Sequence, residues 1–106
     1  MKSNRPFSKS QENAEEHALY EAILTLRTVD ECQRFFRDLC SPAELQALKD
    51  RWHVVGLLEQ GQAYRSIQAQ TGVSVTTIGR IRRFLDEGFG GYRLVRDRVL
   101  QGNRPS

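Results

Sequence analysis

The sequence predicts an all-α fold of about six helices that includes a helix-turn-helix. Three observations predict it. Apolar residues recur at helical spacing through most of the chain, and no segment has the strict alternation that is typical of a strand. The third is the stretch from Tyr64 to Leu85, YRSIQAQTGVSVTTIGRIRRFL, where a short helical pattern, a glycine and a second helical pattern follow one another.

The N-terminal part of the chain predicts a flexible arm followed by two helices. Residues 1–10 are polar and basic without periodicity, so we expect a mobile segment there. Residues 11–26 show the first helical pattern. Thr28 and Glu31 then have the spacing of a capping box, in which each side chain accepts from the other's backbone N–H, and they begin a helix that runs to Leu39.

The apolar stripes of these two helices are wide for so small a chain. The first stripe consists of Ala18, Leu19, Ala22, Ile23 and Leu26, and the second of Val29, Cys32, Phe35, Phe36 and Leu39. A chain of 106 residues covers such surfaces poorly by itself. We therefore expect a homodimer in which a second subunit covers them.

A long helix follows and is expected to be the scaffold of the domain. Ser41, Pro42 and Glu44 form a second capping-box pattern, with proline at the first helical position, where its missing N–H costs nothing. The helix should end near Gly61, a plausible C-terminal cap. Its predicted apolar face consists of Leu45, Leu48, Trp52, Val55 and Leu58.

In the helix-turn-helix, residues 64–70 form the first helix with Ile67 inward, and Gly72 supplies the backbone freedom that the turn needs. Val73 fills the corner, and Ser74 caps the second helix. The inner face of that helix consists of Ile78, Ile81 and Leu85, and its outer face of Val75, Thr76, Gly79, Arg80 and Arg83. Short side chains near its start suit base edges, and arginines suit phosphates. The alternative is an ordinary helical hairpin with a solvated basic face.

Three glycines, Gly88, Gly90 and Gly91, break the pattern before a last predicted helix over residues 92–100. Residues 101–106 are expected to be a tail. The chain is thus predicted to contain one domain over residues 11–100, with the helix-turn-helix at residues 64–85.

The charge of the chain is unevenly distributed. The net charge is +3, but residues 1–60 hold 8 Lys and Arg against 10 Asp and Glu, whereas residues 61–106 hold 8 Arg against 3 acids. The basic half is the half with the helix-turn-helix, as expected for a protein that binds nucleic acid. A basic surface is also suited to an acidic protein partner.

The sequence offers no pattern for an active site. It has no phosphate-binding glycine loop, no nucleophile elbow and no metal-spaced histidines; His17 and His53 are isolated, and Cys32 and Cys40 do not form a zinc cluster. We expect no enzymatic activity, no cofactor and no metal. The sequence also lacks a membrane-spanning run and a signal-peptide pattern, so we expect a cytoplasmic protein.

With DLCSPAEL at the start of the long helix, the LxxGxxY spacing from Leu58 to Tyr64, and GFGGY after the second motif helix, the chain resembles the bacterial tryptophan repressor superfamily. The resemblance covers about residues 19–100 and is greatest to the YerC/YecD-type TrpR-like proteins. It implies a six-helix subunit in an intertwined homodimer, with two helix-turn-helix heads that enter successive major grooves of DNA.

The resemblance also implies two sets of site residues. The DNA-facing surface of the repressor falls on Arg65, Gln68, Val75, Thr76 and Gly79. The pattern of the second motif helix adds Ser74, Arg80 and Arg83 to the expected DNA-binding residues. The corepressor pocket of the repressor falls on Ser41, Arg51, Thr77 and Arg80. A glycine and a serine of that pocket are replaced by Ile81 and Phe84, which we expect to fill the space of the ligand, so tryptophan should not be a corepressor. The alternative is that Phe84 points outward and the pocket persists.

The sequence therefore predicts a sequence-specific DNA-binding transcriptional regulator, a repressor that acts as a homodimer on double-stranded DNA. The alternative from another class is a protein-interaction module whose basic helix docks on an acidic partner.

Overall fold

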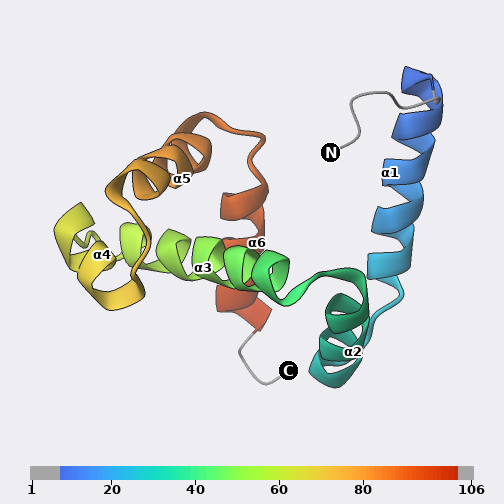
Figure 1. Cartoon of the computed structure of the whole chain (residues 1–106), viewed down its shortest axis with the longest axis horizontal. Coiled ribbons are helices and arrows are strands. Elements are labelled where there is room, and N and C mark those ends of the chain that lie inside the picture. Colours follow the sequence, from blue (N-terminus) through green and yellow to red (C-terminus); the bar gives the residue numbers. More distant parts are fainter. Residues whose placement is uncertain (1–7, 103–106) are drawn as a thin grey trace. The chain divides into compact units, whose positions relative to one another are not determined.

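The computed structural model describes residues 8–102, and the regular elements in that range are all α-helices (Figure 1). Residues 1–7 and 103–106, which include most of the expected arm and tail, lie outside the described residues. The described part contains six helices and no strand: α1 Lys9–Leu24, α2 Val29–Leu39, α3 Pro42–Glu59, α4 Tyr64–Thr71, α5 Val75–Glu87 and α6 Gly91–Gly102. The predicted all-α class is confirmed. Among these helices, none is long and apolar enough to cross a lipid bilayer.

The chain forms two compact units. The first ends at Ser41 and contains α1 and α2, and the second begins at Pro42 and contains α3 to α6. The helix-turn-helix lies wholly in the second unit.

In the first unit, capping interactions set the helix starts. Ser8 caps α1, since its Oγ accepts from Gln11 N at 3.2 Å while Gln11 Oε1 accepts from Ser8 N at 2.9 Å. This box makes α1 begin two residues before the predicted start at residue 11. Thr28 Oγ1 accepts from Glu31 N at 3.0 Å, as predicted, but the Glu31 carboxylate accepts from Arg27 N, one residue before the expected partner.

The apolar side chains of the first unit are poorly covered. Neither α1 nor α2 contains a buried residue. Leu19 is 37% exposed and Leu39 is 49% exposed, although both belong to the predicted apolar stripes. The stripes are therefore only partly covered in the single chain.

The hydrophobic core lies in the second unit, where α4 and α5 pack on α3 and on each other (Figure 1). It consists of Val54, Val55, Leu57 and Leu58 of α3, Ile67 of α4, and Ile78, Ile81 and Leu85 of α5. The predicted inward residues of α4 and α5 are confirmed. The predicted face of α3 is only partly right, because Leu48 is 45% exposed and the core uses Val54 and Leu57 instead.

The turn between α4 and α5 has the predicted chemistry. Gly72 ends α4 with φ 76°, a left-handed conformation that costs glycine little, and its N–H donates to Gln68 O at 2.8 Å. Val73 packs against the core. Ser74 Oγ accepts from Thr77 N at 3.1 Å and so caps α5.

Helix α6 is longer than predicted, because it begins at Gly91 and includes Gln101 and Gly102 of the expected tail. Two arginines attach it to the rest of the unit. Arg96 Nε donates to Glu59 Oε1 at 2.8 Å, and Arg93 Nη2 lies 3.0 Å from Asp86 Oδ1. Arg93 Nε also donates to Leu85 O at 3.1 Å, so it binds the C-terminal end of α5.

Candidate nucleic-acid interface

The outer face of α5 carries the side chains that the sequence assigned to DNA. Ile78, Ile81 and Leu85 are buried in the core, so they fix the rotation of α5 about its axis and determine which residues face outward. Its outward residues are Val75, Thr76, Gly79, Arg80 and Arg83, of which Gly79 is half-buried and the others are exposed. The structure thus brings these five predicted residues onto one face.

The remaining predicted DNA-binding residues are arranged around the start of α5. Arg65 and Gln68 are exposed on α4. Ser74 is exposed as well, but its hydroxyl is engaged in the cap and also donates to Thr77 Oγ1 at 3.0 Å. Ser74 therefore orders the first turn of α5, whatever else it contacts.

The arginines of the second unit fall into two groups. In the first group, Arg82 pairs with Asp86 at 2.9 Å, and Arg93 and Arg96 pair with acids of α5 and α3. The side chains of the second group form no ion pair or hydrogen bond within residues 8–102; its members are Arg51, Arg65, Arg80, Arg83 and Arg98, of which Arg65, Arg80 and Arg83 belong to the predicted DNA-binding surface. A guanidinium group without an acidic partner can bind phosphate without first breaking an ion pair.

A pocket of about 190 Å³ lies behind the outer face of α5, between that helix, α3 and α6. It is lined by Arg51, Thr77, Arg80, Ile81, Phe84 and Tyr92. Three of the four predicted ligand residues therefore meet in one place. The fourth, Ser41, belongs to the other compact unit.

The two bulky replacements behave differently in this pocket. Ile81 is 3% exposed and belongs to the core, as expected for a residue that fills the space. Phe84 is 50% exposed and stands on the pocket wall, so it does not close the pocket as predicted. The physical reason is its place on α5: Ile81 and Leu85 face the core, and Phe84 lies beside that face. The structure therefore agrees better with the alternative stated above, in which Phe84 points outward and the pocket persists.

Tyr92 is a pocket residue that the sequence did not identify. It stands at the start of α6, packs against the core, and lies with its ring centroid 6.5 Å from that of Trp52. Its position after the glycine-rich break was the available signal, but 41 positions separate it from Arg51, and only the folded chain brings the two together.

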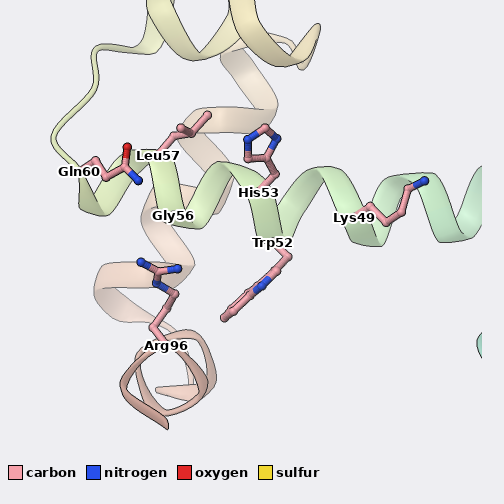
Figure 2. A pocket seen from close by; sticks show the side chains of 7 residues that line it. All are labelled: Lys49, Trp52, His53, Gly56, Leu57, Gln60 and Arg96. Carbon is pink, nitrogen blue, oxygen red and sulfur yellow. The ribbon is translucent and has the colours of Figure 1, made fainter. Parts of the chain in front are cut away.

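A wider groove of about 420 Å³ runs along another side of α3 and is shown in Figure 2. Its lining residues are Lys49, Trp52, His53, Gly56, Leu57, Gln60 and Arg96. Figure 2 shows the Arg96 side chain extending from α6 toward Gly56, and its guanidinium carbon lies 5.9 Å from the centroid of the Trp52 ring. Arg96 is also paired with Glu59, so it serves to hold α6 on α3. No group of acids, histidines and cysteines in the described part of the chain is placed to hold a metal ion.

Comparison with known proteins gives a consistent result. The family model described as Trp repressor protein matches residues 14–100. The uncharacterised protein YerC of Bacillus subtilis is 42% identical over 83 residues, which are 78% of this chain and 80% of YerC.

Two solved structures are similar as well. A TrpR-like protein from Eubacterium eligens has a TM-score of 0.76 and 36% identity, over 85% of this chain and 91% of that one. A candidate Trp repressor from Staphylococcus aureus has a TM-score of 0.78 and 36% identity, over 88% and 95% of the two chains. The resemblance stated from the sequence is confirmed, and the chain belongs to the Trp repressor protein family.

Proposed function

We propose that this protein is a sequence-specific DNA-binding transcriptional regulator that acts as a repressor. Membership in the Trp repressor family supports a DNA-binding regulator. The observation that carries the proposal is the outer face of α5, where short side chains precede two arginines that have no acidic partner within residues 8–102. We expect the protein to work in the cytoplasm of a bacterial cell, where the chromosome is accessible.

In this mechanism α5 enters the major groove with its N-terminal end toward the bases. Val75 and Thr76 contact base edges, because short side chains at the start of a recognition helix reach them. Arg80 and Arg83 of α5 and Arg65 of α4 bind phosphates, which fix the register of the helix on the duplex. Gln68, Ser74 and Gly79 complete the surface that faces the DNA.

We propose a homodimer as the active form. Apolar side chains on both units support it, since Leu19 and Leu39 of the first unit and Leu48 of the second are more than a third exposed. A second copy related by twofold symmetry would cover such surfaces and present a second α5. The two heads would then read half-sites about 34 Å apart, so the operator should be palindromic.

We propose further that free tryptophan is not needed for DNA binding. Ile81 adds a buried side chain at the pocket wall, and Phe84 adds an aromatic ring at its edge. The helix-turn-helix is also held by contacts of its own, such as the Ser74 cap and the bonds of Arg93 to Asp86 and Leu85.

Binding to duplex DNA at several salt concentrations tests the proposed function. Release of counterions makes the logarithm of the affinity fall linearly with the logarithm of the salt concentration. We expect Arg83→Ala and Arg80→Ala each to weaken binding to all sequences and to reduce that slope by about 2, which is about 1 for each subunit of the dimer. Arg98→Ala is the matched control, because Arg98 is exposed on α6, outside the proposed surface.

A competition arm of the same experiment distinguishes the regulator from the second candidate function, a module that docks its basic helix on an acidic protein. Polyglutamate provides the competing charge without bases or phosphates. DNA binding that persists in excess polyglutamate supports the regulator. Equal binding of both polymers, with no preference for any DNA sequence, favours the interaction module.

A further inference from the structure

Gly79 stands at the centre of the exposed face of α5, between Val75 and Arg83 along the helix. Glycine is one of the least favourable residues in a helix interior, because it loses the most backbone freedom on folding and has no side chain to pack. A glycine at such a position therefore requires a reason.

Packing inside the chain does not supply that reason. A Cβ added at Gly79 would have one neighbour within 4 Å outside the backbone of α5 itself, Tyr64 Cε2 at 3.9 Å, which is an ordinary van der Waals contact. The φ angle of Gly79 is not positive, so the backbone does not demand glycine either. Alanine would fit here and would favour the helix.

Gly56, the other glycine in the middle of a helix, shows the contrast. A Cβ at Gly56 would lie 3.4 Å from Nη1 of Arg96, whose side chain extends from α6 toward Gly56 (Figure 2) and is paired with Glu59. At Gly56 the close neighbour belongs to the chain itself. Gly79 is half-buried, and a methyl group at its Cβ position would make only an ordinary contact with Tyr64, so the chain itself leaves room there for a group from outside.

The surroundings of Gly79 indicate what that neighbour is. Tyr64 and Val75 are 37% and 42% exposed, and Thr76 adds a methyl group one turn before Gly79. We call the room for one methyl group at the Gly79 Cβ position, on the part of the surface that carries Tyr64, Val75 and Thr76, the Gly79 notch. The backbone N–H and C=O groups of a helix interior are already paired, so the floor of the notch can offer no hydrogen bond. The notch is therefore suited to an apolar group of about the size of a methyl group.

We propose that the Gly79 notch receives the C5-methyl group of a thymine in the major groove. This inference rests on the proposed DNA-binding function and adds a base preference to it. Among the major-groove edges, the thymine methyl is the apolar group that distinguishes one base from the other three. The missing side chain of Gly79 lets the backbone of α5 come close enough to contact it.

The proposal is tested by removing one methyl group from the DNA and by adding one methyl group to the protein. Duplexes bound by the wild-type protein are first selected from a random-sequence pool, and each thymine is then replaced singly by uracil, which removes only the C5-methyl. One uracil in each half-site should weaken wild-type binding about fifteenfold, which corresponds to about fourfold for each of two buried methyl groups. Gly79→Ala should bind the thymine duplex about tenfold less tightly, because the two methyl groups compete for one space.

The decisive expectation is a reversal of preference. Gly79→Ala should bind the uracil duplex more tightly than the thymine duplex at that position, whereas the wild-type protein prefers thymine. Thermal unfolding of Gly79→Ala should be unchanged or shifted upward, so that a loss of affinity is not a loss of folding. Gly56→Ala is the matched control, because it adds the same methyl group to the interior of α3, outside the proposed surface, and should keep the thymine preference.

The outcomes that overturn the proposal are distinct from failure of the proposed function. If the wild-type protein selects DNA but no uracil weakens it, or if Gly79→Ala loses affinity equally for both duplexes, the notch does not hold a thymine methyl, although the regulator function stands. If the wild-type protein binds no duplex, both are wrong.

Discussion

Arg96 in α6 and Glu59 at the end of α3 form an ion pair of 2.8 Å across 37 positions of the chain. Both side chains are largely covered, with 21% and 25% of their surfaces exposed. The same Arg96 lies over the ring of Trp52, so one residue joins the last helix to the scaffold helix by charge and by packing.

We expect this pair to stabilise the second unit measurably. A double-mutant cycle with Glu59→Gln and Arg96→Gln, followed by urea unfolding, should give a coupling free energy of about 1 kcal/mol. Arg34 and Asp30 of α2 are the control, since their side chains are 73% and 74% exposed and should couple by less than about 0.5 kcal/mol. Equal coupling of the two pairs would contradict the role of burial.

The turn of the helix-turn-helix should depend on Gly72. Because its φ is 76°, a Cβ there is strained, and Gly72→Ala should lower the free energy of unfolding by about 1 kcal/mol. Gly72→Asn should cost less, since asparagine tolerates this conformation. Gly91→Ala is the control, because Gly91 has no positive φ and open space around its Cβ position, and its effect should stay within about 0.5 kcal/mol. A Gly72→Ala protein as stable as the wild type would be inconsistent with the turn geometry.

The homodimer should depend on the apolar stripes of the first unit. Leu19 and Leu39 are exposed in the single chain, so Leu19→Glu and Leu39→Glu would be tolerated by a monomer but would place charges inside a subunit interface. Light scattering at micromolar concentration should show a wild-type dimer and a monomer for the double variant. Gln33→Glu, a polar exposed position of α2, should leave the dimer intact. A well-folded wild-type monomer would rule out the proposed assembly.

Tryptophan should have no effect on DNA binding. Titration calorimetry of the wild-type protein with tryptophan should give no heat of binding, because Ile81 places a buried side chain at the pocket wall. DNA affinity should be the same with and without the amino acid. Micromolar binding that is coupled to tighter DNA binding, and that is lost in Arg51→Ala, would place tryptophan in this pocket and contradict the expectation.

The sequence by itself determined the features that depend on near neighbours. Thr28, Gly72 and Ser74 act within three or four positions of their partners, so the helix ends and the turn were predictable from residue type and order. The inward residues of α4 and α5 were equally predictable, since helical periodicity puts Ile67, Ile78 and Ile81 on one face each.

Tertiary structure decided what depends on distant residues. Val54 and Leu57 are buried and Leu48 is exposed because α4 and α5 cover the C-terminal half of α3, which periodicity along α3 cannot indicate. The division of the arginines into paired and unpaired groups depends on which acids the fold brings near them, as with Glu59 for Arg96. The pocket also depends on residues that are distant in the sequence, because the path of α6 places Tyr92 beside Arg51. The position of the Phe84 ring depends on how the side chains around it pack. These contacts form between residues far apart in the chain, so their energies appear only when the helices pack.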